Sequence, residues 1–304
     1  MVWFIGFRLV QGVISLVILS MIIFGLTRLS GDPALMMIND NSSRAEYEQI
    51  HRSLGLDRPI HEQYYIYVTK ALQGDLGISI HSRQPVSQLL AQRLPNTFAL
   101  LGVAAIMTIF IAVPLGTLAG ANTGSFIDRF GQLVSGLGQS VPVFVVGFVL
   151  ILVFSVYLRI LPSGGMVGWK SYIMPSLCVA IFWAAGIIRV LRSSMIDAIR
   201  SDFVKFARIK GVSRSRTVWV HALRNSLLPV VSLGGMYVAI GITSSVIIEA
   251  VFSWPGVGDL VQHAIASRDF PVIQGVVLTA SLIIVVANIL TDLVYAALDP
   301  RIRL

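Results

Sequence analysis

Residues 202–229 read DFVKFARIKGVSRSRTVWVHALRNSLLP, and they form the most charged part of an otherwise apolar chain. The surrounding window, residues 189–224, holds nine Lys/Arg against two Asp, a balance of nine minus two, or +7. The whole chain carries a formal charge of +8, so nearly all of the excess positive charge lies in this window. We interpret the segment as a water-exposed loop between two membrane-spanning helices, by which the protein is held by a partner.

Local patterns predict two short helices in this loop. Asp202 is placed to cap the first helix, and Gly211 follows it where a left-handed residue commonly ends a helix. Ser213 is then placed to cap the second helix. Four residues share one face of the first helix at i, i+3, i+4, i+7 spacing: Phe203, Phe206, Ala207 and Lys210.

The composition places the chain in a membrane. Of its 304 residues, 55% are hydrophobic and 12% are charged, against about 45–50% apolar and about 25% charged residues in soluble domains. A pI near 10.0 would suggest nucleic-acid binding in a soluble protein. Here the charge is confined to one loop and the C-terminal tail, so membrane orientation explains it and we expect no nucleic-acid partner. The single Cys178 excludes a disulfide framework and a Cys-based metal site, and leaves the redox compartment open.

Six apolar stretches predict an all-α integral membrane protein with six spans. They cover about residues 9–26, 97–121, 133–158, 174–188, 227–248 and a last stretch that begins near residue 269. The first exceeds the roughly 7–15 apolar residues of a signal peptide and has no small-x-small cleavage site after it, so we predict that it is retained. The chain then divides into residues 1–29, an external segment of residues 30–96, and a membrane core of residues 97–304 with a cytoplasmic loop of residues 189–225.

Two of these spans carry unusual small or helix-breaking residues. Gly116-x3-Gly120 in the second span predicts a close helix contact, and Pro114 predicts a kink there. Gly136, Gly138 and Pro142 interrupt the third span, as is tolerated where a broken helix lies inside protein or lines a cavity. An ordinary kink and a translocation path explain this break equally well. The candidate path residues are Gln139, Ser140, Pro142, Ser244 and Ser245.

The distribution of cations predicts the orientation. With six spans both termini lie on the same side, together with Arg8, Arg129 and the basic loop, and the positive-inside rule makes that side the cytoplasm. Residues 30–96 then face outward. We therefore predict a multi-pass protein of the bacterial inner membrane, surrounded by lipid.

The basic loop also carries a family resemblance. The arrangement Ala207-x3-Gly211-x9-His221-x-Leu223, followed by Asn225 and Pro229, resembles the cytoplasmic signature of ABC importer permeases in its dipeptide, oligopeptide and nickel form. Lys205-Phe206-Ala207 stands where Glu-Ala-Ala is usual, and Arg224 stands where Pro is usual. Both departures resemble the peptide subfamily. Motifs outside the loop are similar to the same family: residues 31–33 (GDP), 54–59 (LGLDRP), 74–79 (GDLGIS) and 249–258 (EAVFSWPGVG).

The resemblance implies the type I importer permease fold and a set of partners. These are a second homologous permease, two ABC ATPases that bind the cytoplasmic loops, and an external solute-binding protein. It also implies that ATP and Mg are bound by the ATPases and that this chain binds no cofactor and is not itself an enzyme. The residues with an implied coupling role are Asp202, Phe203, Phe206, Ala207, Arg208, Lys210, Gly211, Val212, Arg214, Arg216, His221, Leu223, Asn225 and Pro229.

The sequence contains no catalytic or nucleotide-binding motif that would make the chain self-sufficient. It has no Gly-x4-Gly-Lys-Ser/Thr phosphate loop and no metal-ligand spacing of its His residues. Glu249 and Asp292 lie near span ends, where a structural or interface role is favoured over proton relay. A stand-alone channel or ion-coupled carrier and a membrane-embedded enzyme are the alternatives from other classes. Within the resembled family the cargo stays open: dipeptides or oligopeptides first, then nickel chelates or glutathione.

Overall fold

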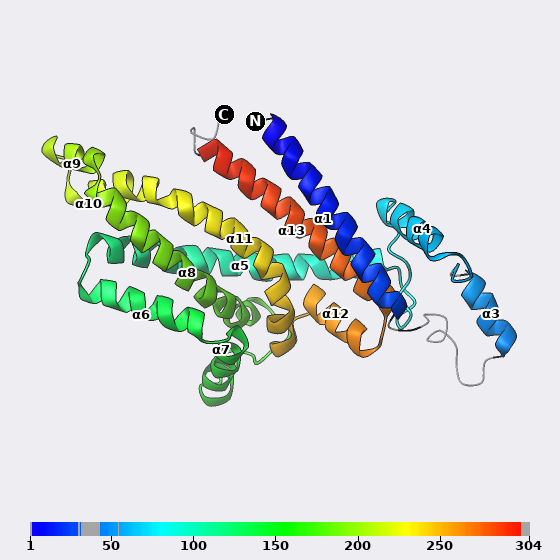
Figure 1. The fold of residues 1–304 in the computed structure, drawn as a ribbon. Coiled ribbons are helices and arrows are strands. Elements are labelled where there is room, and N and C mark those ends of the chain that lie inside the picture. The colour runs from blue at the N-terminus through cyan, green and yellow to red at the C-terminus, as the bar shows by residue number, and fades with distance from the viewer. Residues whose placement is uncertain (1, 30, 32–42, 54, 299–304) are drawn as a thin grey trace. The chain divides into compact units, whose positions relative to one another are not determined.

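The computed structural model describes residues 2–29, 31, 43–53 and 55–298 (Figure 1). Throughout these ranges every regular element is helical, and one isolated bridge pairs Ile78 with Pro85. The prediction of an all-α protein is confirmed. The helices gather into two compact units, Thr97–Pro255 with the residues from Val286 onward, and Val2–Asn96 with Gly256–Val285. The predicted motif residues Asp32, Pro33 and Leu54 and the predicted tail, residues 299–304, lie outside the described residues.

Five helices are long and apolar enough to cross a membrane. The segments that qualify are Gly6–Leu29, Val86–Ala121, Trp169–Arg200, Arg214–Val251 and Phe270–Val294. They lie in α1 (Val2–Leu29), α5 (Val86–Ala121), η2 with α8 (Trp169–Tyr172, Ile173–Arg200), α10 to α11 (Arg214–Arg216, Leu223–Val251) and α13 (Phe270–Leu298). A bent pair of helices makes a sixth candidate if the pair is counted as one span. The helix α5 begins eleven positions before the predicted residue 97 and continues through Pro114 without a break.

The predicted third span is a broken helix. It consists of α6 (Phe126–Ser140), α7 (Val143–Leu150) and the π-helical η1 (Ile151–Tyr157), and the two halves meet at 104°. Pro142 lies directly before α7, and its ring and missing N–H prevent continuation of α6. The interruption predicted from Pro142 is confirmed, whereas Gly136 and Gly138 lie inside α6 and do not break it.

In the first unit, α8 is the central helix, and α6 and α11 pack against it (Figure 1). Small residues on α6 allow the close approach: Gly131 lies against Ile188, and a Cβ on Gly138 would stand 2.8 Å from Cβ of Ala185. Between these two glycines, the Ser135 hydroxyl donates to the Ala185 carbonyl at 2.7 Å. This is the small-residue interface by which helices associate in a lipid environment.

The second unit is held by a buried carboxylate. It contains α1, α3 (Arg44–Ser53), α4 (Ile60–Leu72), α12 (Val257–Ala266) and the adjoining turns of α5 and α13. Asp269, which precedes α13, accepts hydrogen bonds from the Ser79 hydroxyl and from the backbone N–H groups of Ile80 and His81 (3.2 and 3.1 Å). Because a buried carboxylate is costly without partners, these bonds fix the 74–79 motif to the start of α13.

Candidate coupling site

The basic loop begins with the short helix α9 (Asp202–Ile209). Asp202 is its first helical residue, and Ser201 occupies the cap position without a side-chain cap bond. The Asp202 carboxylate pairs instead with Lys205 at 2.9 Å, one turn later on the same exposed surface. The prediction that Asp202 caps this helix is therefore wrong, although a carboxylate in the first turn still interacts favourably with the helix dipole.

The helix α9 presents an apolar and basic surface to solvent. Val204 is fully buried and anchors the helix, whereas Phe206 and Ile209 are 64% and 80% exposed. Phe203 and Lys210 from the predicted face are also exposed, and Ala207 is half-buried. The cations around this surface are exposed as well: Arg208, Lys210, Arg214 and Arg216. A cluster of large apolar side chains in this setting is typical of an interaction surface.

A left-handed glycine ends α9, as predicted. Gly211 has φ +79°, and its N–H donates to the Arg208 carbonyl at 2.9 Å. The N–H of Val212 reaches back to the Ala207 carbonyl at 3.1 Å, which satisfies a second carbonyl at the helix end. Nothing lies within 4 Å of a Cβ built on Gly211, so backbone conformation and not space requires glycine here.

The second predicted helix is not a separate element. The chain continues as helix from Arg214 through α10, the π-helical η3 (Thr217–Ala222) and α11. The prediction of a short helix followed by a span from residue 227 is wrong, because no Gly or Pro stands between Arg214 and Pro229 to end the helix. The signature residues His221, Leu223, Asn225 and Pro229 therefore lie on this one rod. Ser213 stands at its cap position without a side-chain cap bond.

One contact joins the loop to the turn between α5 and α6. The Arg214 guanidinium donates to the Asn122 side-chain oxygen at 2.7 Å, and Asn122 in turn donates to the Leu118 carbonyl at 3.0 Å. The pair is solvent-exposed on the Arg214 side. The loop is thus connected to the α5–α6 turn through one hydrogen bond that water can compete with.

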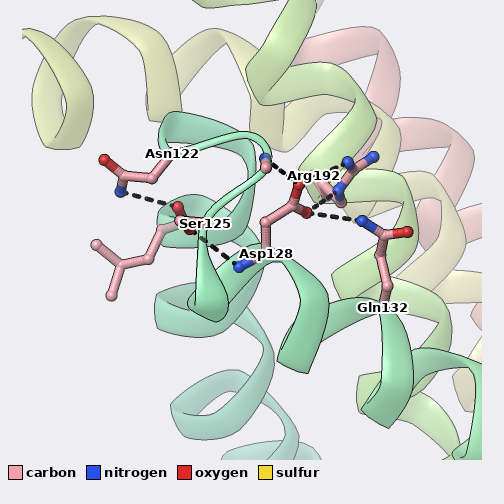
Figure 2. Close-up of polar contacts among 7 residues, drawn as sticks. Asn122, Ser125, Asp128, Gln132 and Arg192 are labelled. Atoms are coloured by element: carbon pink, nitrogen blue, oxygen red, sulfur yellow. Dashed lines mark hydrogen bonds and ion pairs between the residues drawn. The ribbon is translucent and has the colours of Figure 1, made fainter.

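The α5–α6 turn is itself fixed by a buried ion pair, shown in Figure 2. Asp128, 2% exposed, accepts two hydrogen bonds from the Arg192 guanidinium of α8, one from Nε and one from Nη2 at 3.0 Å. It also accepts from the Gly124 N–H at 2.8 Å and from Gln132 Nε2 at 3.0 Å. This bidentate arrangement with added donors satisfies a charge that would otherwise be costly to bury.

Sequence reasoning missed this ion pair, although one signal for it was present. Ser125-x-x-Asp128 has the spacing of a capping box, and the Ser125 hydroxyl accepts from the Asp128 N–H at 3.2 Å (Figure 2). That motif marks where α6 begins, and the Asp128 carboxylate binds the Gly124 N–H before the cap as well as Arg192 of α8. The partner is 64 positions away in the sequence, so no local pattern identifies it.

Two glycines bring α5 against α8 next to the ion pair. A Cβ on Gly120 would stand 2.5 Å from Met195 Cβ and 2.8 Å from the Arg192 carbonyl, and one on Gly116 would stand 3.1 Å from Leu191. The close approach predicted from Gly116-x3-Gly120 is confirmed. It places Arg192 beside the end of α5, where the turn toward Asp128 begins.

The five candidate path residues have different environments. Gln139 and Ser140 at the end of α6 are exposed, and Pro142 lies exposed at the break. Ser244 is half-buried, and Ser245 is buried with its hydroxyl donating to the Ile242 carbonyl of its own helix. Of the five, Gln139 and Ser140 present side-chain polar groups to an open face.

The acidic residues near the span ends also differ. Glu249 is fully buried in α11 and accepts a hydrogen bond from the Thr97 hydroxyl at 2.7 Å, whereas Asp292 is half-buried on α13. Within the described ranges, no three His, Cys, Asp or Glu side chains come together as metal ligands would.

Comparison with known proteins identifies this architecture. Residues 112–304 match the family model "Binding-protein-dependent transport system inner membrane component", and residues 1–101 match the model of the corresponding N-terminal region. The chain is an ABC importer permease. It belongs to the dipeptide, oligopeptide and nickel permease family, whose members are multi-pass inner membrane proteins that work with ATPase and solute-binding partners.

Several curated relatives of this permease are glutathione permeases. It is 36% identical over 297 residues to the glutathione transport system permease protein GsiC of Escherichia coli (strain K12), with 97% of each chain covered. The Pectobacterium atrosepticum GsiC is 37% identical with the same coverage. Among solved structures, an inward-facing form of the MetNI methionine ABC transporter matches with a TM-score of 0.60 and 17% identity, over 70% of this chain and 97% of that chain. This likeness confirms the predicted type I permease fold.

Proposed function

We propose that this permease imports short peptides, glutathione among them, and that partner ATPases drive it through the loop of residues 202–229. In the proposed complex it pairs with a second homologous permease, and two ATPases bind the loops from the cytoplasm. An external solute-binding protein delivers the cargo to the side that carries residues 30–96. Both termini then lie in the cytoplasm, as the cation distribution indicates.

The exposed apolar face of α9 is the observation that carries the coupling role. Phe206 and Ile209 are exposed on a helix that the buried Val204 anchors and that Gly211 ends. Burying each such side chain against a partner contributes about 1.5–3 kcal/mol. Rigid-body motion of the ATPases would then move α9 and the continuous rod that follows it, which is the mechanical requirement for alternating access.

The proposed cargo rests on the similarity to the glutathione permeases. Identity of 36% over nearly the whole chain favours a small peptide-like solute over an ion. Nickel chelates remain the alternative within the same family. Uptake by the reconstituted complex decides between them, with labelled glutathione, a dipeptide and a nickel chelate supplied in parallel with the solute-binding protein.

The coupling role is tested by Gly211→Pro with Gly74→Pro as a matched control. Both glycines have φ near +80°, both have open space around a Cβ, and both donate their N–H to the carbonyl three residues earlier. Proline removes the same bond and imposes the same strain at each. Only Gly211 lies in the loop, so we expect only Gly211→Pro to abolish copurification of the ATPases.

Two results would contradict the proposal. If Gly211→Pro keeps both ATPase association and ATP-dependent uptake, the loop is not the coupling element. If the purified chain alone conducts solute across liposomes without ATP, it is a self-sufficient channel or carrier.

A further inference from the structure

The helix α6 has three distinct faces. Its buried face consists of Asp128, Gly131, Ser135 and Gly138, which pack against α8, and a second face exposes Phe126, Phe130, Leu133 and Leu137. The third face carries the exposed polar side chains of Arg129, Gln132, Gln139 and Ser140 at helical spacing, with the half-buried Gly136 among them.

The helix α8 carries a matching polar face beside the same seam. Ile181, Ala185, Ile188 and Arg192 contact α6, and the neighbouring stripe is exposed: Arg189, Ser193, Asp197 and Arg200. Polar side chains on a membrane-spanning helix face water or other polar groups, because exposure to hydrocarbon is costly. The two stripes therefore mark one hydrated surface.

A contact across three helices shows that the stripes meet. Tyr237 of α11 crosses over Gly186 of α8, where a Cβ would overlap the Tyr237 hydroxyl and would stand 3.0 Å from Gln139 Nε2 of α6. Arg189 follows Gly186 by three positions in α8, so it lies on the same side of that helix as the Tyr237 crossing. Tyr237 is held in place by the ring of Trp183, which stacks on it at an interplanar angle of 5°.

Three cations of this surface, Arg129, Arg189 and Arg200, make no ion pair within the described residues, and Arg189 is the one that lies next to the Gln139–Tyr237 contact. Arg192, three positions later, forms an ion pair with Asp128, whereas Arg189 makes no ion pair within the part of the chain that the structure describes. It stands about three turns before the end of α8, on the open side of the Gln139–Tyr237 contact. Its position and free charge fit an anionic group that passes along the face.

We propose that Arg189, beside Gln139 and Tyr237, lines the translocation path and contacts the carboxylate of the transported peptide. The carboxylate part rests on the proposed peptide cargo. Guanidinium is suited to this role because it stays charged and presents a planar fork of donors to a carboxylate. Gln139 and the Tyr237 hydroxyl add neutral partners for the adjacent amide.

The first test measures the electrostatic potential near residue 139, and its result does not depend on which cargo is transported. The variant Gln139→Cys is made in a Cys178→Ser background, because Cys178 is the only native cysteine. In the complete complex in liposomes, we compare labelling by an anionic and a neutral thiol reagent of similar size. Arg189→Gln is expected to lower the anionic-to-neutral rate ratio by about 3- to 10-fold, because a positive charge that attracts the anionic reagent is removed. Arg200→Gln, a cation on the same stripe three turns away, is the control and should leave the ratio nearly unchanged.

The second test measures recognition of the carboxylate. Uptake of a dipeptide is compared with uptake of its C-terminal amide, each supplied at a concentration that saturates the solute-binding protein. Arg189→Gln should lower uptake of the free acid about tenfold more than uptake of the amide, and Arg189→Lys should keep most of the preference. Equal loss for both cargoes would assign Arg189 a structural role and overturn the proposed contact.

The two tests separate failure of the cargo from failure of the site. If the wild-type complex imports neither peptide, the proposed cargo is wrong, and the labelling ratio still decides whether Arg189 attracts anions in the path. If Gln139→Cys is not labelled by either reagent in any nucleotide state, protein or lipid covers the face. That result, or a labelling ratio that Arg189→Gln leaves unchanged, overturns the inference.

Discussion

The α5–α6 turn and the helix α9 lie in the same unit, but the turn buries its charged group and α9 exposes its charged groups to solvent. In the turn, Asp128 is buried and accepts hydrogen bonds from three residues, Arg192, Gly124 and Gln132. On α9, cations and large apolar side chains face solvent, and Asp202 pairs only with Lys205 one turn away. The difference separates a buried ion pair that is satisfied within this chain from an exposed surface, which we propose that the ATPases cover.

Removing the cation of the buried ion pair should have the largest effect on the stability of this chain. Arg192→Ala leaves the Asp128 carboxylate buried without its charge partner, which costs about 3–5 kcal/mol. Thermal unfolding of the purified permease in detergent measures the loss. The double variant Asp128→Asn, Arg192→Gln should recover most of it, because no net charge is then buried. If Arg192→Ala is as stable as the native chain, the Asp128–Arg192 ion pair does not stabilise the α5–α6 turn.

Filling the gap between α5 and α8 should have the next largest effect. Gly120→Ala puts a Cβ 2.5 Å from that of Met195 and 2.8 Å from a backbone carbonyl that cannot move aside. We expect destabilisation by about 1–3 kcal/mol. Gly102→Ala on the same helix has nothing within 4 Å and serves as the control. There the gain in helix propensity should leave stability unchanged or raise it slightly. Equal melting temperatures for the two variants would contradict the close contact.

Truncating the exposed side chains of α9 should have the smallest effect on stability and a large effect on assembly. The double variant Phe206→Ala, Ile209→Ala removes exposed groups, so the unfolding free energy should change by less than about 0.5 kcal/mol. Association with the ATPases, measured by titration against the purified complex, should weaken at least about tenfold. Phe110→Ala, which removes a 76% exposed side chain from α5, should change neither quantity. A large loss of stability for the α9 variant would show that this surface packs within the chain.

The sequence predicts this architecture well where a signal is local. Hydropathy locates the spans, Gly211 the end of α9, and Pro142 the break after α6, because each acts through its own backbone or side chain. The ends of elements are predicted less well. The patterns predict a cap at Asp202 and a span that begins near residue 227, and both predictions are wrong, because neither the choice of cap nor the continuation of the helix through η3 has a strong local signal.

The long-range parts of the site could not be read from the sequence in this way. Asp128 with Arg192, and Gln139 with Tyr237, are far apart in the chain and meet only because glycines on α5, α6 and α8 let the helices touch. Arg189 and Arg192 look alike as two cations of one basic window. They differ because they point in different directions around the α8 axis. Arg192 points toward α6, and Arg189 points toward the exposed face.

The π-helical segment η3 changes the direction in which side chains point along the continuous helix from Arg214 to Val251. Its bonds span one residue more than those of an α-helix, so each of its residues turns less about the axis. The side chains before Thr217 are therefore rotated about the helix axis, relative to those after Ala222, from the positions that 3.6 residues per turn would predict. Arg214 and Arg216 point in a direction that a helical wheel drawn from α11 alone would assign to other positions. Any design that grafts this loop onto another permease must carry η3 with it, or the loop will face the wrong way.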